Sequence, residues 1–301
     1  MRAVVLEEFG PPENLRLADV PAPVPGPGQV LIDVRIANIT FIDTQLRAGR
    51  SPNPAMVPRL PAILGNGVGG VIAGELVVST TGGSGGYAER VAVNAETPIP
   101  VPAGLTVEDA VALLADGRTA MALIEAVAPQ PGETVLVEAA AGGVGSLLVQ
   151  LARNHGARVI AAVGGPRKQK AAEALGADMA VDYTEPDWAS RVPPVDVVFD
   201  GVGGDIAQQA FTLLRPAGRM CMYGAASGSF ANVPDTPGRT LIRGVQVTPA
   251  RMRDLTIAAL AEAAQGRLRP LIGQTFPLDR AADAHRAIER RETTGKTLLL
   301  V

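Results

Sequence analysis

The chain has 301 residues, a formal net charge of −3 and an isoelectric point near 5.5, so no basic surface of the kind that binds nucleic acid is expected. Its single cysteine, Cys221, excludes an internal disulfide and a multi-cysteine zinc site, as is typical of proteins from a reducing cytoplasm. The first residues carry too short an apolar run for a signal peptide, and no stretch is long and apolar enough to cross a membrane. We therefore expect a soluble cytoplasmic protein of two domains.

The first hundred residues are expected to be rich in β-structure. Arg2–Leu6 and residues 30–36 have the composition of short strands, separated by Pro- and Gly-rich turns. Residues 52–61 are punctuated by prolines and predict a loop. Residues 79–86 are nearly all Ser, Thr and Gly, so we expect a flexible turn there.

After Leu105 the pattern changes to alternating strands and helices. Thr106 to Asp109 resembles a capping box, which predicts a helix beginning there. The alternation predicts an α/β fold, a Rossmann doubly wound parallel sheet inserted in a β-rich domain. We expect residues 105–265 to form the Rossmann domain, and residues 1–104 with 266–301 to form the other domain, which the last strand rejoins. The expected strands are 134–137, Arg158–Val163, 179–181, 195–199, 219–223 and 297–301, and the expected helices are 144–153, 167–175, 206–214, 252–265 and 279–290.

A glycine-rich segment, EAAAGGVGS over residues 138–146, follows a predicted strand and opens a predicted helix. That context is required of a dinucleotide-binding turn, although Ala140 stands at the first glycine position, with Gly142 and Gly145 at the others. Small residues let the backbone approach a pyrophosphate, and the helix N-terminus offers unpaired N–H groups. The alternative is a tight turn of an α/β protein that binds no nucleotide.

The end of the second predicted strand indicates which dinucleotide is bound. An NAD site usually places an acidic residue there for the ribose 2′-hydroxyl, but residues 162–168 read AVGGPRK and contain none. Arg167 or Lys168 could instead pair with a 2′-phosphate, which favours NADPH over NADH. The alternative is that both cations are simply solvated in the first turn of a helix.

Several segments, in this order, resemble one family along nearly the whole chain. They are FGPPE (9–13), FIDT (41–44), GGYAE (85–89), AAAGGVGS with QLA (139–152), VDVVFDGVGG (195–204) and TGK (294–296). On these residues the chain resembles the zinc-independent quinone oxidoreductase branch, similar to ζ-crystallin, of the medium-chain dehydrogenase/reductase superfamily. The resemblance implies a GroES-like catalytic domain around a Rossmann domain, hydride transfer from NADPH to a quinone or an α,β-unsaturated carbonyl, and a homodimer.

The resemblance also assigns site residues, which are expectations at this point. Lys168, with Arg167 and Gly164 beside it, and Tyr183 match positions that hold the 2′-phosphate, although Tyr183 fits a surface cap on a strand equally well. Thr119 matches a residue beside the nicotinamide, with Thr40 and Asp43 in the cleft, Asp43 chiefly as a hydrogen-bonding group. The remaining expected cofactor contacts are Ala141, Gly142, Gly143, Val144, Gly203 and Gly224.

The sequence departs from the family pattern in three respects. Thr40 replaces an Asn, and Gly67 stands where an acidic residue is usual. The chain is also shorter than the family pattern after Ala73 and between Val247 and Arg251, either by true deletion or because loops are missing from the sequence.

The remaining candidate residues suggest no metal and no general acid. We expect Cys221 to be buried and structural, and His155 and His285 to have no catalytic role, because no ligand cluster surrounds them. A 2-enoyl thioester reductase of the same superfamily and a catalytically quiet NADPH-binding sensor remain alternatives.

Overall fold

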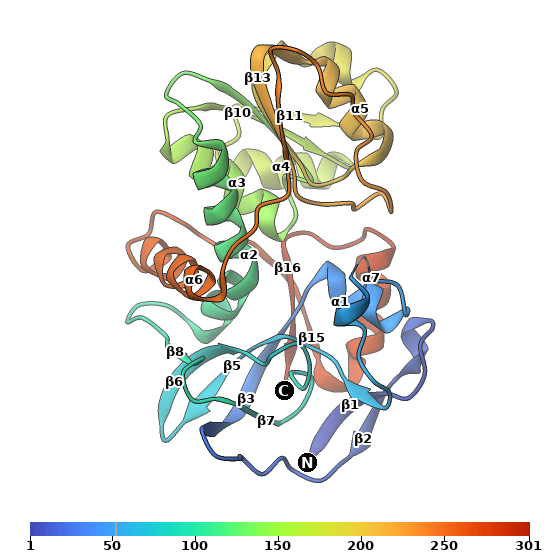
Figure 1. Ribbon diagram of the computed structural model, residues 1–301, viewed down its shortest axis with the longest axis vertical. Helices are drawn as coiled ribbons and strands as arrows, with labels where there is room; N and C mark the ends of the chain where they lie inside the picture. Colours follow the sequence, from blue (N-terminus) through green and yellow to red (C-terminus); the bar gives the residue numbers. More distant parts are fainter. Residues whose placement is uncertain (52) are drawn as a thin grey trace. The chain divides into compact units, whose positions relative to one another are not determined.

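The computed structural model describes residues 1–51 and 53–301, which form two compact units. We call them the β-rich unit (Met1–Ala115 with Ile272–Val301) and the parallel-sheet unit (Asp116–Leu271) (Figure 1). The first boundary falls within helix α2 (Val107–Val127), which begins where the Thr106 hydroxyl accepts a hydrogen bond from the Asp109 amide at 3.1 Å. The second boundary immediately precedes β15 (Ile272–Pro277).

The β-rich unit contains two sheets. One has the order β2-β1-β4, and the other runs β15-β16-β3-β5-β6-β8, with β7 also paired to β3. The C-terminal strand β16 pairs antiparallel with β3 at Thr297 and Ile39, so the prediction that the last strand rejoins this unit is confirmed (Figure 1). The strands are β1 (Arg2–Leu6), β2 (Leu15–Asp19), β3 (Gln29–Ile39), β4 (Ala62–Ile63), β5 (Gly67–Ile72), β6 (Glu75–Thr80), β7 (Arg90–Asn94), β8 (Ile99–Pro100) and β16 (Lys296–Leu300).

Two short helices, α1 (Phe41–Arg47) and α7 (Ala281–Glu289), complete this unit. The predicted loop at 52–61 contains the 3₁₀ turn Pro54–Met56, and its first residue, Pro52, lies outside the described residues. The predicted flexible turn at 79–86 overlaps the end of β6. There the Ser79 hydroxyl is buried and lies 2.9 Å from the hydroxyl of Thr97.

After Ala73, where the chain is shorter than the family pattern, a tight hairpin joins β5 to β6. Ile72 pairs with Glu75, and the two turn residues Ala73 and Gly74 have φ values of 50° and 91°. Two central turn residues with positive φ match the twist of the flanking strands, so the chain forms a regular two-residue β-hairpin at this length. At Gly67 a Cβ atom would lie 2.5 Å from the side-chain nitrogen of Asn38, which explains why no acidic residue stands there.

The parallel-sheet unit contains six strands in the order β11-β10-β9-β12-β13-β14, and every pairing between them is parallel. This confirms the predicted Rossmann-type sheet. All residues of β9 are buried, as expected where helices cover both faces of a parallel sheet. The strands are β9 (Thr134–Glu138), β10 (Arg158–Val163), β11 (Met179–Asp182), β12 (Val195–Asp200), β13 (Leu214–Met222) and β14 (Thr240–Arg243).

The helices of this unit are α3 (Gly143–Asn154), α4 (Pro166–Ala174), α5 (Gly204–Thr212) and α6 (Pro249–Ala264). The predicted helix at 206–214 ends early, because Leu214 already begins β13 and is buried in the core. Strand β14 was not predicted. The chain is also shorter than the family pattern between Val247 and Arg251. There Thr248 caps α6 by accepting a hydrogen bond from the Arg251 amide, so the chain connects directly into that helix.

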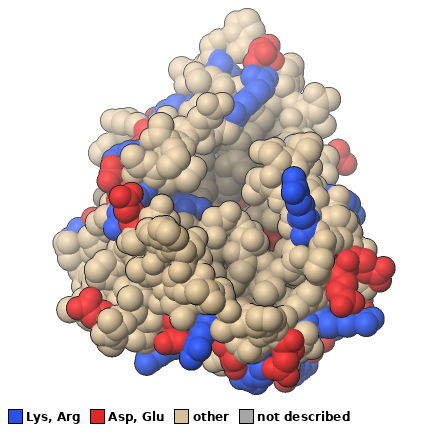
Figure 2. Space-filling model, turned by 60° about the horizontal axis from the view of Figure 1, so that its bottom comes forward, with Lys and Arg blue, Asp and Glu red and all other residues tan. Residues whose placement is uncertain are grey.

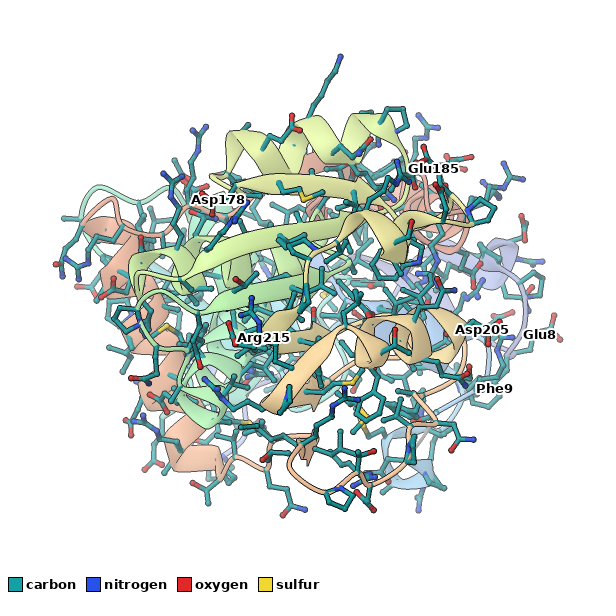
Figure 3. All side chains as sticks on the ribbon, turned by 90° about the horizontal axis from the view of Figure 1, so that it is seen from above. Glu8, Phe9, Asp178, Glu185, Asp205 and Arg215 are labelled. Atoms are coloured by element: carbon teal, nitrogen blue, oxygen red, sulfur yellow. The ribbon has the colours of Figure 1, made fainter. Side chains whose placement is uncertain are left out.

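The strands share one direction, which Figure 3 makes visible from four labelled residues. Asp178 precedes β11 and Arg215 lies at the start of β13, and both lie toward the same end of the sheet. Glu185 follows β11 and Asp205 follows β12, and both lie toward the opposite end. The second end is therefore the carboxyl edge of the sheet, where open α/β proteins bind ligands.

The surface shows mixed charge. On the face seen in Figure 2, basic and acidic side chains are interspersed and form no single-sign patch. None of the helices in the described part of the chain is both long enough and apolar enough to cross a membrane.

Candidate dinucleotide site

The site lies at the carboxyl edge of the parallel sheet, where the strand order reverses. Strands β9 and β12 are neighbours there, yet the chain leaves β9 toward β10 on one side and continues from β12 to β13 on the other. Such a switch point leaves a crevice between the two strand ends, because the connecting segments diverge. The predicted cofactor residues of this unit lie on the turns that follow its strands or in the first turn of the next helix.

The glycine-rich turn joins β9 to α3 as predicted. Ala139 has a φ of 48°, and the Gly142 amide donates to the Ala139 carbonyl at 2.8 Å, which closes the turn. At Gly145 a Cβ atom would lie 2.3 Å from that same carbonyl oxygen. Only glycine lets the helix approach the strand so closely, and the N-terminus of α3 is directed at the crevice as a result.

Asp116 lies beside the glycine-rich turn, where sequence reasoning did not expect an acid. A Cβ atom at Gly143 would lie 1.9 Å from a carboxylate oxygen of Asp116, so this side chain of α2 lies against the first residue of α3. The positive end of a helix dipole attracts a carboxylate as it attracts a phosphate. Asp116 thus places negative charge beside the turn assigned to the pyrophosphate, and only the fold brings the two segments together.

The predicted 2′-phosphate residues converge at the ends of β10 and β11. The Tyr183 ring packs over Gly164, where a Cβ atom would lie 3.4–3.6 Å from ring atoms and the hydroxyl. Gly165 has a φ of 93° and starts α4, whose first turn carries Arg167 and Lys168. Arg167 is exposed, whereas Lys168 and Tyr183 are half-buried.

Asp182 is a second acid that the sequence analysis did not single out. It pairs with Val163 across β10 and β11, and it is 7% exposed. Burial opposes its ionisation, but hydrogen bonds from the Thr184 side chain and amide and from the backbone of Gly165 hold the pKa of Asp182 below its usual value. The Asp182 carboxylate therefore helps to fix the backbone of Gly165, which starts the helix that carries Arg167 and Lys168.

The loops after β12 and β13 pack closely against each other. At Gly224 a Cβ atom would lie 2.6 Å from the Gly201 carbonyl oxygen, and at Gly203 one would lie 2.0 Å from the Ser229 carbonyl oxygen. The Gly203 φ of 73° also favours glycine. The predicted residues Gly203 and Gly224 thus share one part of the carboxyl edge, held by contacts that leave no space for side chains.

A pair of buried acids lies beneath these loops. Glu138 ends β9 and Asp200 ends β12, and both are fully buried. Burial raises the pKa of Glu138 well above its usual value, and the neighbouring Asp200, hydrogen-bonded to it, raises it further. Burial also raises the pKa of Asp200, while hydrogen bonds from Glu138 and the backbone amides of Gly203 and Val202 oppose that rise. Burial therefore favours the retention of a proton by this pair of acids.

In the β-rich unit, Thr40 and Asp43 lie together at the start of α1. The Thr40 amide and hydroxyl both donate to one oxygen of Asp43 at 2.7 Å. Tyr87 also hydrogen-bonds to Asp43, and its hydroxyl lies 3.1 Å from Nε2 of His285. Burial raises the pKa of Asp43 and lowers that of His285 to about 3, so His285 is neutral. Thr119 is half-buried on α2 in the parallel-sheet unit.

The remaining cysteine and histidine candidates are not arranged as metal ligands in the described part of the chain. Cys221 is buried in β13, as predicted, and burial raises its pKa to about 12. His155 is exposed at the end of α3. Across residues 1–51 and 53–301, no three His, Cys, Asp or Glu side chains gather in a way that could hold a metal ion.

The parallel sheet with its glycine-rich turn at the switch point defines a Rossmann-type dinucleotide-binding protein. Residues 175–299 match the zinc-binding dehydrogenase family. The chain is 32% identical to a 2-haloacrylate reductase of Burkholderia sp, over 99% of this chain and 98% of that one. It is also 32% identical to a quinone oxidoreductase of Pseudomonas aeruginosa, over 97% of both. The chain therefore belongs to the quinone oxidoreductase branch of the medium-chain dehydrogenase/reductase superfamily and is an oxidoreductase.

Solved structures agree with this assignment. The structure of an NAD-dependent alcohol dehydrogenase superposes with a TM-score of 0.90 at 30% identity, and it covers all of both chains. The quinone oxidoreductase from Thermus thermophilus, also determined in complex with NADPH, superposes with a TM-score of 0.82 at 34% identity, again over both whole chains.

Proposed function

We propose that this protein is an NADPH-dependent reductase that transfers a hydride to a quinone or to an α,β-unsaturated carbonyl compound. The observation that carries the choice of NADPH is the end of β10, where Tyr183 packs over Gly164, Lys168 lies in the first turn of the following helix, and no acid stands on the strand itself. The NADPH complex of the similar Thermus enzyme supports the same choice. The reductase of 2-haloacrylate among the relatives supports an activated alkene as acceptor.

The residues of the parallel-sheet unit fit such a cofactor. The turn from Ala141 to Val144 would hold the pyrophosphate on backbone N–H groups, because its glycines leave the backbone uncovered. Lys168, with Arg167 nearby, would pair with the 2′-phosphate, and Tyr183 would add a hydroxyl donor. Gly203, Gly224 and Thr119 would border the nicotinamide half. Bound NADPH supplies the hydride, and the protein supplies orientation and electrostatics.

Thr40 would orient the substrate or cofactor and would not protonate it. Its hydroxyl has a single hydrogen, which is donated to Asp43 at 2.7 Å, so the Thr40 oxygen presents lone pairs to a ligand. Asp43 is 1% exposed and acts through Thr40, which makes it a positioning residue. A proton for the reduced product would then come from water.

We propose further that the enzyme needs no zinc, acts in the cytoplasm and forms a homodimer. The dispersed Cys221, His155 and His285 support the first point. Elemental analysis of purified protein is expected to give far less than one zinc per chain, and one equivalent would contradict the proposal. Light scattering on the eluting peak of a gel-filtration column is expected to give twice the chain mass.

An acceptor screen tests the proposed activity. Purified protein is mixed with NADPH or NADH and with a simple quinone, an unsaturated ketone, 2-chloroacrylate or an enoyl-CoA, while absorbance at the nicotinamide band is followed. We expect oxidation of NADPH with the quinone or the ketone. Turnover of enoyl-CoA alone would replace the proposal by a thioester reductase. Tight NADPH binding without oxidation by any acceptor would favour a sensor.

A further inference from the structure

The buried acids Glu138 and Asp200 have no role in the function proposed so far. They end adjacent parallel strands, and the preceding residues Val137 and Phe199 are paired in register. Both side chains are 0% exposed, and a single backbone amide, that of Val202, donates to an oxygen of each acid. Two ionised carboxylates in such a place would repel each other strongly, so a hydrogen bond between them requires one proton.

The carboxylate oxygens of Glu138 and Asp200 accept hydrogen bonds from backbone amides of the loop that follows β12. One oxygen of Asp200 accepts from the Gly203 amide at 2.7 Å and from the Val202 amide at 3.0 Å. One oxygen of Glu138 accepts from the same Val202 amide at 3.3 Å. The other oxygen of each acid is buried and finds no donor among the protein groups of the described chain. A proton shared between the two acids satisfies both of these oxygens.

We propose that Glu138 and Asp200 share one proton and that the resulting carboxyl–carboxylate pair is a positioning element, which fixes the Gly201–Gly203 turn against the dinucleotide. The inference rests on the proposed function, because it takes that turn as one wall of the NADPH site. Asp200 supplies the acceptor for two backbone amides, and Glu138 supplies the hydrogen that makes this carboxylate tolerable in a buried place.

In the described part of the chain, neither Glu138 nor Asp200 is hydrogen-bonded or ion-paired to a lysine or an arginine. Cys221 of strand β13 and Tyr223, just after this strand, lie close to the acids, and burial raises the pKa of both groups, which favours their neutral forms. Helix α2 contributes Asp116, which is acidic, and Asp205 at the start of α5 is exposed. Loss of the shared proton would therefore leave two adjacent negative charges, and the turn would be held less well.

The first test measures NADPH binding by fluorescence from pH 6 to pH 9 on the full chain. Glu138→Gln keeps a neutral hydrogen donor of the same size, so we expect a dissociation constant within about threefold of wild type and a flatter pH profile. Glu138→Leu removes the donor, and we expect roughly tenfold weaker binding or more, the effect of losing one well-placed charged hydrogen bond. Asp196→Asn, at the opposite end of β12, is the matched control and should bind normally.

The second test needs no cofactor. A carboxyl whose pKa is raised on folding stabilises the protein below its unfolded pKa, and this stabilisation is lost as pH rises through the folded pKa. The melting temperature of Glu138→Gln should therefore rise relative to wild type between pH 6 and pH 9. In hydrogen exchange, the Val202 and Gly203 amides should exchange faster in Glu138→Leu than in Glu138→Gln.

The outcomes separate the two proposals. If wild-type protein binds no NADPH, the proposed function fails, and the exchange and melting measurements still decide the inference. Normal NADPH binding by Glu138→Leu, or equal damage from Gln and Leu at position 138, would overturn the positioning role. Unchanged protection of the Val202 and Gly203 amides in Glu138→Leu would overturn it as well.

Discussion

Replacement of Lys168 by alanine is the sharpest test of how the protein selects its cofactor. Lys168 lies in the first turn of α4, which starts at the Gly165 cap directly after β10. It is half-buried, and the Tyr183 ring packs over Gly164, the residue that follows β10. The 2′-phosphate is present in NADPH and absent from NADH, so the substitution should affect only one of the two cofactors.

The expected size of the effect follows from the exposure of the side chain. A hydrogen bond to a charged group contributes about 1.5–3 kcal/mol, and each 1.4 kcal/mol is about tenfold in affinity. Because Lys168 is only half-buried, solvent screening reduces this contribution, and we expect the low end of the range. NADPH should bind roughly tenfold more weakly to Lys168→Ala, while NADH affinity should stay nearly unchanged.

The measurement is a pair of fluorescence titrations, with NADPH and with NADH, at low and at high salt. The preference of wild type for NADPH should decrease as salt rises, because exposed charges are screened. Lys170→Ala, which removes a second cation of the same helix, is the matched control and should retain the full preference. An equal loss of both cofactors in Lys168→Ala would show that Lys168 does not read the phosphate. A wild-type preference for NADH would refute the whole argument from the end of β10.

Three further substitutions test other parts of the molecule. Asp116→Asn removes negative charge beside Gly143, so NADPH affinity should increase by about threefold to tenfold in a binding titration, and a decrease would show that the carboxylate supports the site. Gly145→Ala drives a Cβ atom to 2.3 Å from a backbone oxygen, so urea unfolding should report a loss of about 1–3 kcal/mol, and wild-type stability would contradict the close helix approach. His285 has a folded pKa near 3, below the value in an unfolded chain, so wild-type stability should fall as pH decreases from about 6.5 toward 3. His285→Gln should flatten that part of the melting profile, and an unchanged slope would place the acid sensitivity elsewhere.

The acids of the site show why sequence reasoning found only part of it. The glycine-rich turn and the basic pair are contiguous in the sequence, and their strand–turn–helix context could be read from local patterns. Between Asp116 and Gly143 lie the rest of α2 and strand β9, and between Glu138 and Asp200 lie helices α3 and α4, strands β10 and β11 and a 3₁₀ turn. No local pattern marks such pairs, because an acid at the end of an apolar strand has the same composition whether it faces water or a second acid.

The sequence by itself determined most of the alternating strands and helices in the second half of the chain, where apolar runs and glycine stops mark them, although it did not indicate β14. It also determined the dinucleotide turn, because the chemistry of that turn lies in consecutive small residues. It was less informative for the first hundred residues, where short strands such as β4 and β8 form only through their partners. Only the tertiary structure decided which acids meet at the carboxyl edge. The pairing of Glu138 with Asp200, and of Asp182 with the Gly165 backbone, depends on strand register, and register is fixed by packing of the whole sheet.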